Sequence, residues 1–345
     1  MQSLNHVVIF LLTSLFLLLP SHTFAKDKCT NSQDKYTCYG TEVNKIISQK
    51  GVASAMEYVH RVVLPTNGYS IVHIVLHSVG EAAYFEQKKD LTKTLSYMRP
   101  YTKYARDGQY LNGFDGFYHG AITAYFFDNK DSELLQSLVA KVCEGQVTIP
   151  GIGAGTFECY HTVGHALMNA LGNKLQLALA SCDQQPSQTA QAGCYYGVFM
   201  ENSFLYSSSY HPGLPRPDVE GSSMVSVCAR FESEKNYYCS HFVGQVYLTT
   251  HPGDMKGAFD ECKKLKTYNT FCIQRLGVMF IPSHYKGDYS KMIKTCDYAG
   301  TQYVSICKAA VDQGVKLGFG GDVKNSKAEE FISFLKGTFL GFLWR

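Results

Sequence analysis

The segment CYHTVGHALMNAL, residues 159–171, carries the signals that decide the fold. Its apolar residues recur at spacings of three and four, as they do on one face of an α-helix. The segment begins at a cysteine, has a glycine at position 164 and places two histidines four residues apart. Similar segments recur along the chain, so we interpret this stretch as one unit of a repeat. The apolar positions are Val163, Ala166, Leu167, Ala170 and Leu171.

Glycines mark the period of this repeat. They are separated by 40, 44, 33, 47 and 33 residues, within the range of helix-pair repeats. Because a glycine inside a helix costs about 1 kcal/mol relative to alanine, we expect these glycines to let neighbouring helix backbones approach closely. The sequence therefore predicts an all-α fold, an α-solenoid of about seven helical hairpins. The glycines are Gly80, Gly120, Gly164, Gly197, Gly244 and Gly277.

The 12 cysteines form six pairs in sequence order. In the last five pairs, the first cysteine ends one predicted helix and the second begins the next, so each disulfide would link the two helices of one hairpin. A loop of this length stabilises the fold by about 3 kcal/mol in the chain-entropy description. A zinc site would instead favour Cys-x-x-Cys spacing, which is absent here. The predicted pairs are Cys29 with Cys38, Cys143 with Cys159, Cys182 with Cys194, Cys228 with Cys239, Cys262 with Cys272, and Cys296 with Cys307.

The first 25 residues resemble a cleavable export signal. They contain no charged side chain, and an apolar run from Val7 to Pro20 precedes Thr23-Phe24-Ala25. This run is shorter than the roughly 18 to 20 residues of a membrane-spanning helix. We therefore expect an exported protein, periplasmic or secreted, in an oxidising compartment where cysteines form disulfides.

The predicted organisation has three parts. Residues 1–25 are the signal peptide, residues 26–68 hold an N-terminal disulfide segment and the first helices, and residues 69–345 form the repeat array. Ser326 and Glu329 have the spacing of a capping box, which predicts a helix that caps the C-terminal end of the array.

Charge and motifs exclude several classes of function. The formal net charge is only +3 and the charges are interspersed, so we expect no nucleic-acid partner. The part of the chain after the signal holds no segment apolar enough to cross a membrane, so we do not expect an integral membrane protein. The sequence has no Gly-x-Ser-x-Gly motif, and the predicted disulfides leave no thiol nucleophile.

Residues 228–320 resemble the Sel1-like repeats, relatives of the tetratricopeptide repeat, in particular their cysteine-rich versions. The resemblance implies a right-handed α-solenoid that binds other molecules, usually proteins. The His-x-x-Gly-His element has no counterpart in that family, and the resemblance transfers no catalytic residue. It rests on Cys262 and Cys272, Leu276–Phe280, Tyr285–Asp288 and Lys291–Cys296.

Histidines suggest a metal site. His161 and His165 are four residues apart on a predicted helix, and so are His73 and His77, so each pair lies on one helix face. Such pairs can chelate a transition metal such as Zn, Cu or Fe. Stacked hairpins would gather histidines on one concave wall, and a carboxylate would complete the ligand set. The candidate ligands are His161, His165, His119, His241, His77 and Glu201, with Glu81 as a further carboxylate.

A structural role for the same residues stays open. A histidine at a repeated position can hydrogen-bond a tyrosine or a carbonyl of the next helix. The 24 tyrosines, against one tryptophan, suit either a peptide-binding or sugar-binding groove or a helix interface, and helical spacing favours the interface. The sequence thus predicts a helical-repeat binding protein with a His/Tyr-lined concave face, whose partner is a protein, a peptide or a small molecule. Two alternatives are a metal-dependent enzyme that uses the same His/Glu cluster and a metal-free interaction scaffold.

Overall fold

The computed structural model describes residues 28–30, 32, 35–67, 69–106, 109–110, 113–131, 134–145, 147–153, 155–204, 223–317 and 319. Its regular structure is helical apart from one antiparallel pair of two-residue strands, which confirms the predicted all-α class. The predicted signal peptide, residues 1–25, and the predicted capping helix with Ser326 and Glu329 lie outside the described residues.

Most helices are short and belong to hairpins. The two strands are β1 (Ala105–Arg106) and β2 (Gln109–Tyr110), and short π or 3-10 turns occur at η1 (Val59–Val63), η2 (Arg99–Tyr104), η3 (Leu276–Phe280) and η4 (Cys296–Ala299). The α-helices are α2 (Lys35–Tyr58), α3 (Leu64–Thr66), α4 (Tyr69–Glu86), α5 (Leu91–Ser96), α6 (Asp115–Asn129), α7 (Leu135–Cys143), α8 (Phe157–Ala170), α9 (Leu175–Asp183), α10 (Gln188–Phe204), α11 (Met224–Cys228), α12 (Ser233–Ser240), α13 (Val243–Thr250), α14 (Met255–Lys263), α15 (Asn269–Arg275), α16 (Ile281–His284), α17 (Tyr289–Thr295) and α18 (Val304–Lys316).

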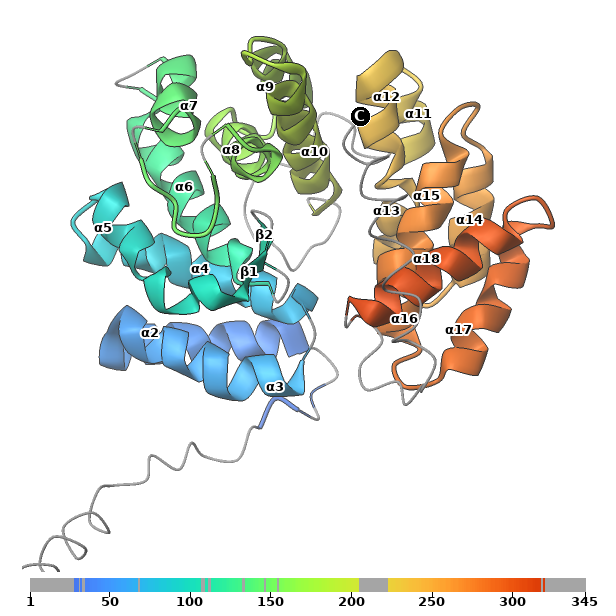
Figure 1. Ribbon diagram of the computed structural model, residues 1–345, viewed down its shortest axis with the longest axis horizontal. Coiled ribbons are helices and arrows are strands. Elements are labelled where there is room, and N and C mark those ends of the chain that lie inside the picture. Colours follow the sequence, from blue (N-terminus) through green and yellow to red (C-terminus); the bar gives the residue numbers. More distant parts are fainter. Residues whose placement is uncertain are drawn as a thin grey trace, which may run out of the picture.

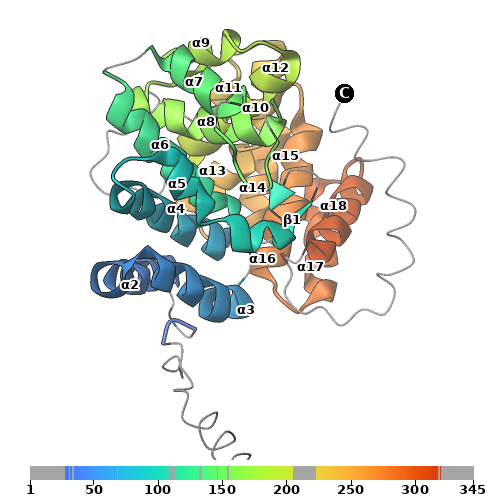
Figure 2. The same ribbon diagram turned by 60° about the vertical axis from the view of Figure 1, so that its left-hand side comes forward.

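The longer helices pack against one another in chain order (Figure 1). α2 packs on α4, α4 on α6, α6 on α8, and α8 on α10. The shorter α5, α7 and α9 each pack against the long helix that follows, and α14 and α17 do the same with α15 and α18. Both Figure 1 and the turned view of Figure 2 place α2 and α3 at one end of the molecule and α7, α9 and α12 at the other.

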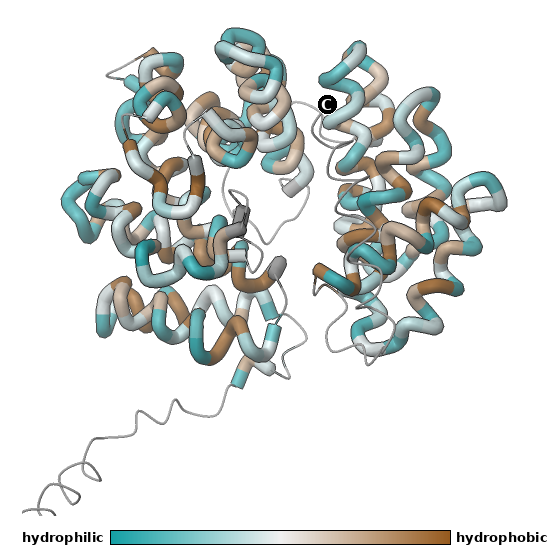
Figure 3. Tube along the Cα trace, viewed as in Figure 1, coloured by the Kyte–Doolittle hydropathy of each residue, from teal (hydrophilic) through white to brown (hydrophobic). Residues whose placement is uncertain are grey.

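The core lies between successive helices. Hydrophobic residues recur along the helices throughout the described chain, as Figure 3 shows. Tyr39, Tyr84, Tyr118 and Tyr160 are among the largest fully buried side chains, so these tyrosines belong to the helix interfaces. Among the described helices, none combines the length and the apolar character needed to span a lipid bilayer.

The structure contains the six disulfides that the sequence predicts. Five of them join the two helices of one hairpin, and the first ties the segment before α2 to that helix. The pairs are Cys29–Cys38, Cys143–Cys159, Cys182–Cys194, Cys228–Cys239, Cys262–Cys272 and Cys296–Cys307.

Glycines bring the backbones of α4 and α6 into direct contact. A Cβ atom added to Gly116 or Gly120 of α6 would overlap the carbonyl oxygen of His73 or His77 in α4. In the other direction, a Cβ on Gly80 of α4 would overlap a carbonyl of α6. The helices can therefore approach this closely only with glycine at these positions.

The pair α8 and α10 repeats this contact. A Cβ on Gly197 of α10 would overlap the carbonyl oxygen of His161, and one on Gly164 of α8 would overlap that of Cys194. Four of the repeated glycines, Gly80, Gly120, Gly164 and Gly197, thus allow the close backbone approach that we expect of glycines inside helices, whereas Gly244 meets the side chain of Leu276.

We predict opposite effects for two glycine-to-alanine substitutions in helices. Gly120→Ala should destabilise the protein by about 1–3 kcal/mol, because the new methyl group forces α4 and α6 apart. Gly40→Ala should stabilise it by about 0.4–1 kcal/mol, because a Cβ there meets nothing within 4 Å and alanine is the better helix former. Urea unfolding of the oxidised proteins, followed by circular dichroism, measures both. Equal midpoints for Gly120→Ala and the wild type would contradict the close contact.

Candidate metal centre

Five histidines from three neighbouring helices meet in the core. α4 provides His73 and His77, α6 provides His119, and α8 provides His161 and His165. The four-residue spacing in α4 and in α8 places each pair on one helix face. Since α6 packs on both α4 and α8, His119 lies between the two pairs.

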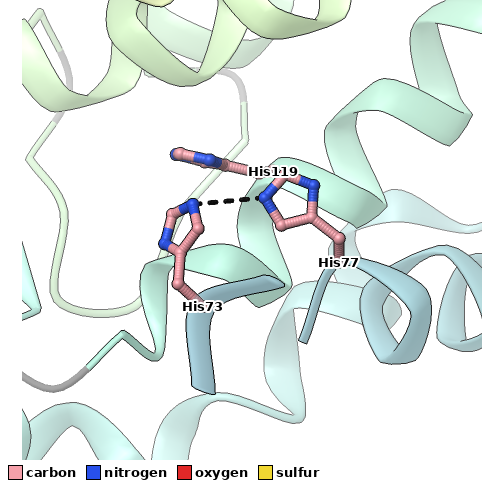
Figure 4. A group of neighbouring side chains, drawn as sticks. All are labelled: His73, His77 and His119. Carbon is pink, nitrogen blue, oxygen red and sulfur yellow. Dashed lines mark hydrogen bonds between the residues drawn. The ribbon is translucent and has the colours of Figure 1, made fainter. Parts of the chain in front are cut away.

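The two histidines of each pair face one another through the same nitrogen. His73 Nε2 lies 3.2 Å from His77 Nε2, and His161 Nε2 lies 3.1 Å from His165 Nε2. The ring centroid of His119 lies 4.7 Å from that of His73 and 4.6 Å from that of His165. Figure 4 shows the ring of His119 across from the His73–His77 pair. Four of the five side chains are buried, and His77 is half-buried.

Carboxylates lie against the outer nitrogens of this cluster. His165 Nδ1 is 2.7 Å from Glu201 Oε2, and both side chains are 1% exposed. A carboxylate accepts a hydrogen bond, so the proton of the imidazole is held on Nδ1 and the lone pair on Nε2. Histidines that bind metals are typically oriented in this way. The other two such pairs are His73 Nδ1 with Asp115 Oδ1 at 3.2 Å, and His161 Nδ1 with Glu158 Oε2 at 3.3 Å.

The facing nitrogens have the spacing of ligands around one metal ion. With Nδ1 protonated on both His161 and His165, two lone pairs point at each other across 3.1 Å. Such a pair is stabilised by a cation between the two nitrogens, either a proton or a metal ion. In a tetrahedral zinc site with Zn–N bonds of about 2.0–2.1 Å, two nitrogen ligands are about 3.3–3.4 Å apart. The observed separations are close to this value.

The candidate ligand atoms form two groups that share His119. The atoms of His73, His77 and His119 lie within 4.8 Å of one another, and so do those of His119, His161 and His165. Ligands on opposite sides of an ion are about 4.2 Å apart at bond lengths near 2.1 Å, so a small approach of the three side chains would let each group bind one ion. Within the described part of the chain, the five histidines do not form a single group of this size.

His119 is held in the neutral form. Burial lowers the pKa of His119 well below its ordinary value, and the neighbouring histidines lower it further. Its Nδ1 is buried and has no hydrogen-bond partner among the described residues. A neutral imidazole with an unsatisfied nitrogen is the form that binds a metal ion.

The structure brings four of the predicted ligands together and reveals a different role for a fifth. His77, His119, His161 and His165 lie in the cluster. Glu201 lies beside them, but it contacts the outer nitrogen of His165 and also accepts a hydrogen bond from an asparagine. We therefore interpret Glu201 as a residue that orients a ligand. The cluster is also largely buried between helices, where the sequence predicts a concave wall.

Two predicted residues lie elsewhere. The ring of His241 is not part of either group and instead lies 4.9 Å from Tyr237 and 5.7 Å from Phe271. The side chain of Glu81 is exposed on α4, also outside both groups. Neither residue contributes a ligand atom to the cluster in this arrangement.

Sequence reasoning missed two of the orienting carboxylates. Asp115 precedes His119 by four residues on α6, but it faces His73 of the neighbouring helix, so local spacing does not reveal its partner. Glu158 precedes His161 by three residues on α8, a spacing that places the two side chains together. That spacing is a signal that could have identified Glu158.

A second cluster adjoins the histidines and is centred on Tyr196 of α10. The ring of Tyr196 lies 5.1 Å from that of His161 and 5.2 Å from that of Phe242. Arg275 donates a hydrogen bond from Nη1 to Tyr196 Oη, and its guanidinium lies 4.7 Å from the ring centroid of Phe242. Burial lowers the pKa of His241 to about 3, and the nearby charge of Arg275 adds to this effect.

The chain matches no protein-family model, and no curated protein or solved structure is significantly similar to it. The roles of the residues in both clusters are therefore argued from their geometry.

The lowered pKa of His241 predicts a loss of stability in acid. The unfolded chain takes up a proton on this residue below pH 6.5, whereas the folded chain does so only near pH 3, so stability falls as the pH falls between these values. Between pH 7 and pH 5, the free energy of unfolding should fall by about 1–2 kcal/mol less in His241→Gln than in the wild type. Urea unfolding at the two pH values measures the difference. His251→Gln, at an exposed position, is the control and should match the wild type.

Proposed function

We propose that this chain is an exported helical-repeat protein that binds transition-metal ions through its five clustered histidines. One observation carries the proposal: the Nε2 atoms of each histidine pair face each other at ligand spacing while carboxylates lie against outer nitrogens. Neutral imidazole suits Zn, Cu and Fe.

The charge of the surroundings supports a metal ion over a purely structural histidine ladder. Three carboxylates, those of Asp115, Glu158 and Glu201, lie against a cluster whose central residue, His119, is held neutral. Each carboxylate lies against the Nδ1 of one histidine, which favours a proton on that nitrogen and a lone pair on Nε2. A metal ion would bind where these lone pairs converge.

The architecture we propose is an α-solenoid related to the Sel1-like repeats. It is supported by the packing of successive helices in chain order and by disulfides across the hairpin turns. The six disulfides also fit an oxidising environment, in agreement with export. A protein or peptide partner for the array remains part of this proposal.

A metal-dependent enzyme is the second candidate. The group that His119 ligates has three histidine nitrogens, which leaves a fourth tetrahedral position for water, as in zinc enzymes with three protein ligands. Azide binding to the Cu-loaded or Co-loaded protein, followed by its visible spectrum, would identify an open position. A spectrum that azide leaves unchanged favours the binding role.

We predict two metal ions per chain, one at each histidine pair, with the single lone pair of His119 ligating one of them. The full chain is purified from an oxidising compartment, loaded with Zn, Cu or Fe, freed of excess metal and analysed by inductively coupled plasma mass spectrometry. His161→Ala/His165→Ala and His73→Ala/His77→Ala should each lose one ion, because His119 and the other pair remain. Glu201→Gln should weaken binding by about 10- to 100-fold, since it removes the charge that orients His165.

The matched control is His251→Ala/His284→Ala, which removes two exposed histidines and should retain both ions. If the wild-type protein binds one ion and both double variants of the cluster bind none, the cluster holds a single metal site. A wild-type protein that binds none of the three metals would overturn the proposed function.

A further inference from the structure

Among the residues that the structure describes, one edge of the Arg275 guanidinium has no hydrogen-bond partner. Nη1 donates to Tyr196 Oη, but Nε and Nη2 are buried and make no hydrogen bond with any described residue. The N–H groups of Nε and Nη2 point the same way, and this is the edge that binds a carboxylate through two parallel hydrogen bonds. Buried N–H groups of a cation that lack an acceptor are unfavourable, so this edge is suited to an external anion.

His241, which lies beside the same tyrosine as Arg275, has a third unsatisfied polar atom. Its Nε2 is buried without a hydrogen-bond partner among the described residues, and it is close enough to Arg275 to feel its charge. The ring of Tyr196 lies 5.9 Å from that of His241, so Arg275 and His241 flank one tyrosine. A neutral imidazole can donate a hydrogen bond from this nitrogen to an anion.

Aromatic rings lie beside the His241 imidazole. The ring of Tyr237 lies 4.5 Å from that of Phe271, and the ring of Phe271 stacks on that of His241 at 5.7 Å. Tyr237, Phe271, Arg275 and His241 all retain partial exposure, so the cluster reaches the protein surface. Such rings accept a flat apolar group by stacking or edge contact.

We propose that Arg275, His241, Tyr237 and Phe271 form a binding site for an aromatic carboxylate. The carboxylate binds side-on to Nε and Nη2 of Arg275, His241 Nε2 contacts one of its oxygens, and the aromatic body lies against Tyr237 and Phe271. This site uses none of the five clustered histidines, so it stands or falls separately from metal binding.

Isothermal titration calorimetry of the full oxidised chain tests the site. Benzoate should bind, and benzamide, which has the same shape without the charge, should bind at least tenfold more weakly. Arg275→Lys keeps the positive charge but removes the two parallel N–H groups. Its affinity for benzoate should therefore be at least tenfold lower. Arg230→Lys makes the same change at an exposed arginine and should bind like the wild type.

Chemical modification keeps the test independent of variant folding. Phenylglyoxal should modify Arg275 in the wild type, and benzoate should protect it, as mass spectrometry of the peptides would show. Equal affinity for benzoate and benzamide, sulfate binding as tight as benzoate, unchanged affinity in a folded Arg275→Lys variant, or no protection of Arg275 would each overturn the proposal.

Discussion

The direct contact of helix backbones at glycine is the constraint on which the cluster depends. Gly120 meets the carbonyl of His77, and Gly197 meets the carbonyl of His161, so the contacted carbonyls belong to histidines of the cluster. A larger residue at either glycine would push the histidine backbone away, and the imidazole would move with it. The glycines therefore set the distance between neighbouring helices. That distance brings the histidines of these helices close enough to contact one another.

Disulfides hold helices that are too short to be stable alone. α7, α9 and α14 have nine residues each, and isolated helices shorter than about 12–15 residues are marginal in water. The disulfide Cys143–Cys159 joins the end of α7 to the first turn of α8, two residues before His161. It thereby fixes the start of α8, the helix that carries two of the five clustered histidines.

Local spacing predicts much of this structure, and contacts between distant residues explain the rest. Short separations in sequence predict the disulfide pairs. They also predict that His161 and His165 lie on the same face of one helix. His241 matches His161 in its repeat position, since each precedes a glycine by three residues, yet only helices packed side by side can share a site. The repeat pattern gives equivalent positions and not spatial neighbours. For the same reason Glu201 could be predicted near the cluster but not assigned to the outer nitrogen of His165.

The two clusters occupy equivalent positions in successive units of the repeat. His119 precedes Gly120 as Tyr196 precedes Gly197, so the same scaffold position holds a central imidazole in one unit and a phenol in the next. The phenol ring lies beside that of His161, and its hydroxyl receives the Arg275 hydrogen bond. A cation at the histidines and the guanidinium would therefore both lie near one tyrosine. Their positive potentials would add in a partly buried region of low dielectric, where an anion is attracted most strongly.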